Sequence, residues 1–306
     1  MAPRVGLLLP QYDCEIDATL RAARAADAAG LDIWIAGQIF PISNRPEKPA
    51  FEPLTLMGAL TAATTEARLG FMVLAAPYYS SILLAKAINT LDHLSGGRIE
   101  IGLGSGWREE EFEALDVPFA PGSRRRAQLE ERIDAIEALA RGGVAHTESG
   151  SEVVSGPAGV QSPPPLWIAG RGPKLAELVG RRASWANFAR GISVDEFVAA
   201  AATVRAAAAG RADGGPRLSL TATFLGADDE RALAAKVAER ASARGQDPEA
   251  YRASIRAANA LVGDPEEIAA QLGPYLEAGC EAVILWPLDG DHEGAPGTLA
   301  AVRSKL

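Results

Sequence analysis

Short apolar runs recur along the whole chain, and alanine-rich stretches with amphipathic spacing lie between them. Buried parallel strands read as short continuous apolar runs, whereas surface helices repeat their apolar positions every three or four residues. The pattern therefore predicts alternating strands and helices. The predicted strands are Arg4–Leu9, Asp32–Ala36, Leu69–Ala75, Arg98–Leu103, Leu166–Gly170, Ser184–Phe188, Arg217–Leu225 and Glu281–Trp286.

The predicted helices occupy the stretches between these strands: Glu15–Ala29, Pro53–Thr65, Ile82–Leu94, Arg124–Arg141, Pro173–Arg182, Val194–Ala209, Asp228–Arg244 and Pro265–Ala278. Eight alternations of strand and helix are typical of a (β/α)8 TIM barrel. An open doubly wound sheet is the alternative, but eight units in 306 residues close more naturally into a barrel. We therefore expect residues 1–306 to form a single barrel domain.

Several helices carry clear signals at their ends. Asp264, Pro265 and the two glutamates that follow supply an N-cap, a proline in the first turn and first-turn acids. Asp228 and the acidic residues after it open another helix in the same way. Gly30 and Gly279 stand where helices must stop, because glycine readily adopts the left-handed conformation that closes a helix.

Two long connections interrupt the regular alternation. The loop Gly37–Ala50 follows the second strand, and we interpret it as a lid or substrate wall, because long ordered loops are uncommon unless they cover a site. A surface loop without a function is the alternative interpretation. The polar segment Gly143–Pro165 precedes the fifth strand. Within it, Val144–Glu148 and Glu152–Ser155 are predicted to pair as a surface hairpin around Ser149-Gly150.

Composition narrows the range of functions. The net charge of −9 argues against nucleic acid and anionic membranes as partners, because both require a basic surface. The apolar start Val5–Pro10 is too short for a signal or membrane helix, so we expect a cytoplasmic protein. Cys14 and Cys280 lie far apart, and neither a disulfide framework nor a metal site is expected. Arginine far outnumbers lysine, a bias typical of GC-rich genomes such as those of actinobacteria.

The stretch Leu94–Trp107 organises the rest of the chain. Small residues break the preceding helix, a buried strand follows, and Gly104, Ser105 and Gly106 stand at its end. Glycine has no Cβ, so a flat ring or a phosphate can approach the backbone closely there. A tight turn between strand and helix is the alternative interpretation of so short a motif.

Several motifs together resemble the luciferase-like superfamily. They are Leu91–Arg98, Gly102–Trp107, Glu111-Phe112, Pro118-Phe119, Phe51–Gly70, Pro164–Pro173 and Leu261–Glu267. The superfamily joins flavin-dependent luciferases and alkane monooxygenases to reductases that use the deazaflavin coenzyme F420, and the resemblance is strongest to actinobacterial F420-dependent oxidoreductases. It implies a TIM barrel, a small organic substrate and a homodimer.

The resemblance also implies where the cofactor binds. Ala75 and Ala76 are small enough for a tricyclic ring to lie against the backbone, and the family has a non-prolyl cis peptide bond in this segment. Gly104, Ser105 and Gly106 would border the same ring.

A second stretch is suited to the phosphate of the cofactor. Gly170, Arg171, Gly172 and Pro173 end the fifth strand and open a helix, which leaves backbone N–H groups at the positive helix end. Arg171 and Lys174 would add positive charge for an anionic tail. Surface residues without a ligand are the alternative interpretation of these two side chains.

Two departures from the family concern proton transfer. Sugar-phosphate dehydrogenases of the superfamily use a histidine after the second strand and a glutamate just after the glycine turn. These positions are here Gln38 and Trp107, which exchange no proton near neutral pH, and we interpret both as substrate contacts. Tyr78 and Tyr79 follow the cofactor segment and are candidate proton donors. Tyrosines that merely line the barrel mouth are the alternative.

The three histidines receive less weight. His93 precedes a strand, on the face that barrels do not use for catalysis, so a structural role is expected. His146 lies in the predicted hairpin and is expected to be solvated. His292 follows the last strand on the catalytic face, in a loop expected to be polar and mobile.

These observations predict an oxidoreductase that uses F420 to transfer a hydride to or from a small organic substrate. The first alternative is an FMN-dependent monooxygenase of the same fold, and the second is a flavin-binding relative without turnover. Deazaflavin reacts poorly with oxygen, so it suits hydride transfer better than oxygenation.

Overall fold

The structure is a computed structural model that describes residues 2–41, 47–170 and 172–306. The order of its parallel strands runs from β12 through β1, β2, β3, β5, β8 and β9 to β10, which pairs again with β12. This is the closed (β/α)8 TIM barrel that the sequence predicted. The strands are β1 (Arg4–Leu8), β2 (Asp32–Ile35), β3 (Leu69–Phe71) with β4 (Leu74–Ala75), β5 (Ile99–Gly104), β8 (Leu166–Ala169), β9 (Trp185–Phe188), β10 (Arg217–Gly226) and β12 (Cys280–Pro287).

The chain divides into two compact units, which are described separately. The glycine-turn unit comprises residues 11–20 and 35–169, and the C-terminal unit comprises residues 1–10, 21–34 and 170–306. Helix α1 (Ile16–Ala28) contributes residues to both. The single domain expected over residues 1–306 stays a prediction.

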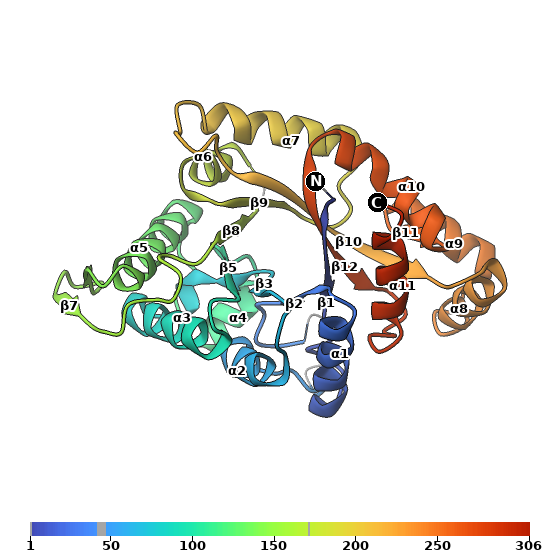
Figure 1. Cartoon of the computed structure of the whole chain (residues 1–306), viewed down its shortest axis with the longest axis horizontal. Helices are drawn as coiled ribbons and strands as arrows, with labels where there is room; N and C mark the ends of the chain where they lie inside the picture. Colours follow the sequence, from blue (N-terminus) through green and yellow to red (C-terminus); the bar gives the residue numbers. More distant parts are fainter. Residues whose placement is uncertain (1, 42–46, 171) are drawn as a thin grey trace. The chain divides into compact units, whose positions relative to one another are not determined.

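The glycine-turn unit contains β3, β4, β5 and β8 with their helices. Helices α3 and α5 lie side by side (Figure 1). The predicted third strand is interrupted, because a non-prolyl cis peptide bond between Met72 and Val73 separates β3 from β4. The helices are α2 (Pro53–Ala63), α3 (Ser81–Ser95), α4 (Glu109–Ala114) and α5 (Gly122–Ala140), with a short 3₁₀ helix at Ala76–Tyr78.

The connections that lead into the strands stabilise this unit, as predicted. Arg98 donates hydrogen bonds to the carbonyl oxygens of Thr61 (3.1 Å) and Ala67 (2.9 Å), and so ties the end of α2 to the start of β5. His93 bonds the carbonyl oxygen of Ala158 through Nε2 at 2.8 Å, which confirms its structural role. Gly96 closes α3 with a φ of 64°.

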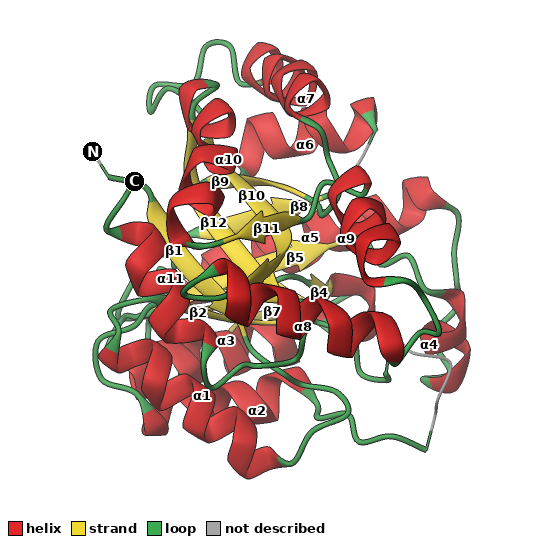
Figure 2. Ribbon diagram, turned by 90° about the vertical axis from the view of Figure 1, so that its right-hand side faces the viewer, coloured by secondary structure: helices red, strands yellow, loops and turns green. Residues whose placement is uncertain are grey.

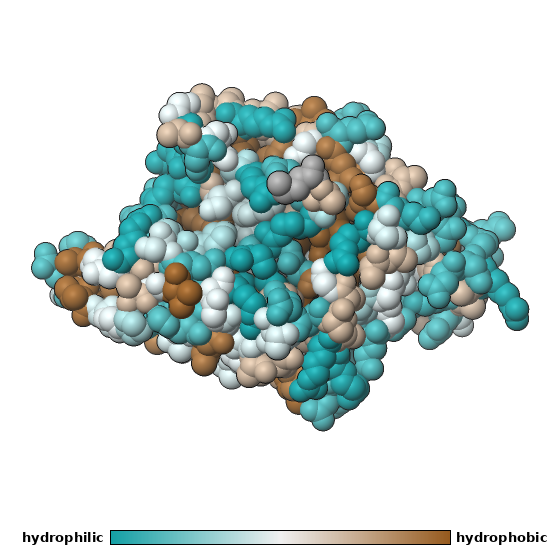
Figure 3. All heavy atoms as spheres, viewed as in Figure 1, coloured by the Kyte–Doolittle hydropathy of each residue, from teal (hydrophilic) through white to brown (hydrophobic). Residues whose placement is uncertain are grey.

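The segment before β8 forms the predicted hairpin. Strands β6 (Val144–His146) and β7 (Glu152–Val154) pair antiparallel, with Val144 opposite Val154. This valine pair is exposed, at 45% and 74% of the two side chains, and Figure 3 shows apolar surface where Figure 1 places β7. His146 is also exposed, as expected. The other long connection, Gly37–Ala50, is described except for residues 42–46.

The C-terminal unit contains β1, β9, β10 and β12, and an additional strand, β11 (Leu261–Gly263), pairs with β10. Helices α6 and α7 lie side by side (Figure 2). Asp264 forms the expected capping box, whereas the cap of α8 is Asp229 and not Asp228. The helices are α6 (Pro173–Arg182), α7 (Val194–Ala207), α8 (Glu230–Ser242), α9 (Pro248–Ala257), α10 (Pro265–Glu277) and α11 (Ala295–Arg303).

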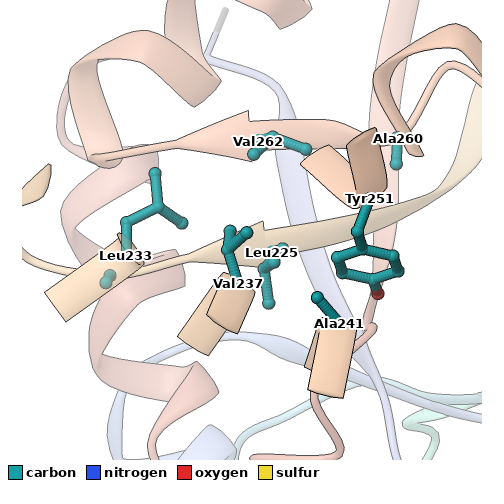
Figure 4. Packing of buried hydrophobic residues seen from close by; sticks show 8 residues of the cluster. Leu225, Leu233, Val237, Ala241, Tyr251, Ala260 and Val262 are labelled. Carbon is teal, nitrogen blue, oxygen red and sulfur yellow. The ribbon is translucent and has the colours of Figure 1, made fainter. Parts of the chain in front are cut away.

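Helices α8 and α9 enclose a small apolar cluster of their own. Leu233 and Val237 of α8 and Tyr251 of α9 point toward Leu225 of β10 and Val262 of β11 (Figure 4). The sequence pattern did not predict α9 and β11. Among the described residues of α9 only Tyr251 is buried, and β11 is three residues long, so neither shows a clear period. None of the described helices is long and apolar enough to span a membrane.

Candidate active site

The backbone after β3 passes very close to two glycines. The cis peptide bond joins Met72 to Val73, a little before the predicted ring contact Ala75. A Cβ on Gly37 would lie 2.0 Å from the carbonyl oxygen of Val73. A Cβ on Gly102 would lie 1.7 Å from the carbonyl oxygen of Phe71. Both positions therefore require glycine for the chain to turn from β3 into β4.

Protein side chains fill the space beside the glycine turn. Gly104 pairs with Ala75 across β5 and β4, and a Cβ on Gly104 would lie 2.9 Å from a methyl group of Val73. A Cβ on Gly106 would lie 2.6 Å from the ring of Phe112, and Gly106 has a φ of 75°, a conformation that favours glycine. Packing thus requires both glycines, and their contact with a cofactor ring stays a prediction.

Exposure distinguishes the other predicted contacts. Ala75 keeps 8% of its surface exposed and Ala76 keeps none, so Ala75 is the member of this pair that can touch a ligand. Ser105 is half-buried. Trp107 exposes 66% of its surface directly after the turn, which leaves its indole available to a substrate.

A buried carboxylate joins the turn to the loop after β2. Glu111 of α4 is 1% exposed, and its Oε2 accepts a 2.8 Å hydrogen bond from the Tyr78 hydroxyl. Its Oε1 accepts from the backbone N–H groups of Ile39 (3.2 Å) and Phe40 (3.1 Å), and Nη1 of Arg108 lies 3.5 Å from it. These donors compensate the carboxylate for the water that it loses on burial.

Glu111 belongs to one of the motifs that resemble the superfamily, but the sequence alone indicated no role for it. Three consecutive glutamates begin α4, and the first two, Glu109 and Glu110, are exposed. Glu111 adjoins Phe112, which is fully buried, and Phe112 stacks edge-on against Tyr78 with 4.8 Å between ring centroids. An acid at the edge of the apolar face of a short helix was the available signal.

Gln38, a predicted substrate contact, is held by the strand-end residues Gln11 and Tyr12. Its Oε1 accepts a 3.1 Å hydrogen bond from the Tyr12 hydroxyl, and its carbonyl oxygen accepts a 2.8 Å bond from Nε2 of Gln11. Gln11 also donates to the carbonyl oxygen of Phe51 at 3.1 Å. Gln38 is half-buried and positioned from two directions, as a recognition residue requires.

Tyr79 connects the site to the hairpin. Its hydroxyl donates a 3.3 Å hydrogen bond to Glu52, the N-cap of α2, and its carbonyl oxygen accepts a 3.0 Å bond from Nε of Arg132. Arg132 is 4% exposed and forms a 3.1 Å ion pair with Glu148, just after β6. Glu148 in turn accepts from the N–H of Ser81 at 2.7 Å.

The three tyrosines of this site remain neutral at physiological pH. Burial raises the pKa of Tyr12, Tyr78 and Tyr79 above the ordinary value, and nearby carboxylates raise it further. Glu111 is the carboxylate that acts on Tyr12 and Tyr78, and Glu52 acts on Tyr79. Each hydroxyl therefore keeps its proton and serves as a hydrogen-bond donor.

The predicted phosphate contacts lie at the start of α6 in the C-terminal unit. Gly172 is the N-cap with a φ of 99°, and Pro173 follows in the first turn. Apart from its two chain neighbours, no atom of the described residues lies within 4 Å of a Cβ built on Gly172. A Cβ on Gly170 would lie 1.9 Å from the Leu175 side chain. Arg171 lies outside the described residues. The open N-terminus of this 10-residue helix fits an anionic group.

His292 is buried, although its loop was expected to be polar and mobile. Its side chain is 9% exposed, and its ring hydrogen-bonds the backbone of Leu8. Burial lowers the pKa of His292 to about 4, although Asp289 and Asp291 oppose the shift. Among the described residues its Nδ1 has no hydrogen-bond partner. The linear pattern of residues contains no sign of this burial, because the contact with Leu8 joins distant parts of the chain.

Comparison with known proteins agrees with the barrel. The family model described as luciferase-like monooxygenase matches residues 3–282. The chain belongs to this family. A solved structure with the same fold is the monooxygenase RslO1 from Streptomyces bottropensis, with a TM-score of 0.80, 20% sequence identity and coverage of 99% of this chain and 98% of that one.

Two relatives of the luciferase-like chain have different cofactors in their names. The F420-dependent hydroxymycolic acid dehydrogenase of Mycobacterium tuberculosis is 31% identical over 68% of this chain and 58% of its own length. The FMNH2-dependent dimethylsulfone monooxygenase of Pseudomonas putida is 27% identical over 82% of this chain and 69% of its own length. The match to several other mycobacterial proteins, at 43% identity, spans 30% of their length. The family thus includes both F420-dependent dehydrogenases and FMN-dependent monooxygenases.

Proposed function

We propose that the protein is a coenzyme F420-dependent oxidoreductase that transfers a hydride to or from a small organic substrate. The dehydrogenase relative supports the cofactor, and the arginine-rich composition agrees with an actinobacterial host. The observation that carries the proposal is the hydrogen bond from Tyr78 to Glu111, because oxidation of an alcohol or amine moves one proton for each hydride.

The residues present fit such a cofactor at two places. The backbone N–H groups of Gly172 and Lys174, with Arg171, would hold its phosphate, since the space beside Gly172 is open and the next N–H groups of α6 already bond the carbonyl oxygen of Gly172. The exposed part of Ala75 and the backbone at Ser105 and Gly106 would border its ring. When bound, F420 supplies the carbon that accepts or gives the hydride.

Tyr78 and Glu111 form a proton relay in this proposal. Tyr78 donates its hydroxyl proton to Glu111, so its oxygen is free to accept a proton from a substrate hydroxyl. During oxidation the substrate O–H proton passes to Tyr78 and the proton of Tyr78 passes to Glu111. The hydride leaves the substrate carbon, and the carbon–oxygen double bond forms. Reduction follows the reverse path. Tyr78 is never a phenolate, the state that its raised pKa disfavours.

Titration of the purified protein with F420 and with FMN, followed by absorbance and fluorescence, tests the cofactor. We expect saturable binding of F420 and hydride exchange between reduced F420 and a carbonyl or imine substrate. Oxygen uptake is measured in parallel with each reduced cofactor. Little oxygen consumption is expected with reduced F420, because deazaflavin reacts poorly with oxygen.

The FMN-dependent monooxygenase is the second candidate, and the dimethylsulfone monooxygenase relative favours it, since that match covers more of this chain. Oxygen-dependent turnover with reduced FMN would replace the F420 proposal by this one. Tight binding of FMN without turnover, in the presence and absence of oxygen, would instead identify a flavin-binding protein.

A further inference from the structure

An arginine without a counter-ion lies at the carboxyl end of β9 in the C-terminal unit. This arginine is Arg190, and its guanidinium lies over the ring of Trp286, 4.8 Å from the ring centroid. Trp286 is half-buried near the end of β12. Arg190 makes no hydrogen bond or ion pair with any side chain or backbone group of the described residues. Its N–H donors are therefore available to a ligand.

Two other arginines of this unit that stack on a tryptophan are already neutralised. Arg4 and Arg217 both lie over a tryptophan ring, and they form ion pairs with Asp32 (2.7 Å) and Glu281 (2.8 Å). Arg190 is an exposed residue, but desolvation of its guanidinium still lowers its pKa, and no anion among the described residues opposes that shift. A cation that is stacked, partly desolvated and without an anion gains most from an anionic ligand.

A hydroxyl group lies at the same strand ends. Thr223 of β10 pairs in register with Trp286 of β12, so the two side chains point to the same face of the sheet. Deeper on this face, the hydroxyls of Ser219 and Thr221 each donate to Oδ1 of Asn187 at 3.1 Å. Thr223 has no such acceptor among the described residues, and it is half-buried. Barrels bind their ligands at this end of the strands.

We propose that Arg190, Trp286 and Thr223 form a subsite for a carboxylate group of the substrate. The planar fork of a guanidinium matches a carboxylate with two parallel hydrogen bonds, and the hydroxyl adds a third donor. A phosphate dianion usually gathers several cations or a helix N-terminus. Lys236, on the helix after β10, is already bound to two aspartates. The identification of this carboxylic acid as the substrate rests on the proposed function, whereas the anion-binding subsite itself does not.

Calorimetric titration of the purified full chain without cofactor tests the subsite with three probes: benzoate, the neutral benzamide and inorganic phosphate. We expect benzoate to bind about tenfold more tightly than benzamide, as one charge-assisted interaction predicts. Arg190→Gln should abolish that difference, and Arg190→Lys should retain part of it. Arg217→Gln is the matched control, since Arg217 is also stacked on a tryptophan but already paired, and should leave benzoate binding unchanged.

Equal binding of benzoate and benzamide overturns the proposal, as does benzoate binding that survives in a folded Arg190→Gln variant. If phosphate binds more tightly than benzoate and Arg190→Gln abolishes phosphate binding, the subsite binds a phosphate group. That result overturns the proposal of a carboxylate subsite. Titration of the wild type with F420 and FMN tests the proposed function independently. If the protein binds benzoate more tightly than benzamide but binds neither cofactor, the subsite is confirmed and the proposed function is wrong.

Discussion

The Tyr78 hydroxyl donates a 2.8 Å hydrogen bond to Glu111, a carboxylate that is 1% exposed. The two residues come from different segments, the turn after β4 and the helix after the glycine turn. The same carboxylate also binds the backbone of the loop after β2. One buried charge therefore fixes three loops at the strand ends of the glycine-turn unit, and this gives it both a structural and a chemical role.

Tyr78→Phe should lower turnover at least about tenfold, because it removes the group that accepts the substrate proton. Steady-state kinetics with whichever cofactor supports turnover would measure this decrease in turnover. Glu111→Gln should have a similar effect, and the double variant should lose little more than the poorer single variant, since both belong to one relay. Losses that multiply in the double variant would contradict the relay.

Tyr79→Phe is the control for this series. Its hydroxyl bonds Glu52 at the start of α2, and its backbone carbonyl, which binds Arg132, is unchanged by the substitution. We expect turnover close to that of the wild type. A loss in Tyr79→Phe with full activity in Tyr78→Phe would transfer the proton-donor role to Tyr79. Thermal melting of Glu111→Gln separates lost chemistry from lost folding, since Glu111 also holds backbone N–H groups.

Gln38→Ala should mainly raise the Michaelis constant of the substrate, with turnover little changed. An amide exchanges no proton at neutral pH, so Gln38 can contribute binding but not acid–base catalysis. Tyr12→Phe is the matched variant, because it removes the hydrogen bond that orients Gln38 and leaves the amide in place. A smaller rise of the Michaelis constant is expected there. A fall in turnover with an unchanged Michaelis constant would exclude a binding role for Gln38.

Gly172 and Gly106 should respond to substitution in opposite ways. Gly172→Leu should weaken cofactor binding much more than folding, because no atom lies within 4 Å of the added Cβ although its φ of 99° adds some strain. Gly106→Ala should lower the melting temperature, since the added Cβ would lie 2.6 Å from Phe112. Unchanged cofactor affinity in Gly172→Leu would remove this loop from the site. Arg171→Ala should weaken binding in a salt-sensitive way.

The sequence predicted the strands of the barrel well, because a parallel strand buried on both faces is a continuous apolar run. β5 is an example, buried at every position. The interruption between β3 and β4 was harder to place, since the glycines that make room for it lie elsewhere in the sequence: Gly37 in the loop after β2 and Gly102 in β5. Short elements such as α4 and β11 were missed, because a few residues show no period.

The candidate site was predicted in part, and its limits have a physical cause. Tyr78 and Gln38 follow strands and Ala75 ends one, so the alternation of strands and helices places all three at strand ends. Glu111 was assigned no role because its burial depends on donors from other segments, which a linear pattern does not contain. For the same reason the buried state of His292 could not be predicted, since Leu8 lies at the other end of the chain.

His292 should make the protein less stable in mild acid. The pKa of His292 is about 4 in the folded chain and near its ordinary value of 6.5 in the unfolded chain. When the pH is above 6.5, the imidazole is neutral in both states and has no effect on the pH dependence of stability. As the pH falls through the window between the two values, the unfolded chain binds a proton that the folded chain does not, so the free energy of unfolding decreases. The loss is at most about 3 kcal/mol.

Urea unfolding at about pH 7.5 and about pH 5 measures this loss, and His292→Gln should reduce it, because glutamine does not titrate there. The charged neighbours remain in that variant: Asp289 and Asp291 stay paired with Lys236. His93→Gln is the control, since His93 is exposed, and it should keep the pH dependence of the wild type. If the wild type and His292→Gln lose equal stability between the two pH values, another group causes the acid sensitivity, and the neutral imidazole over Leu8 is not its source.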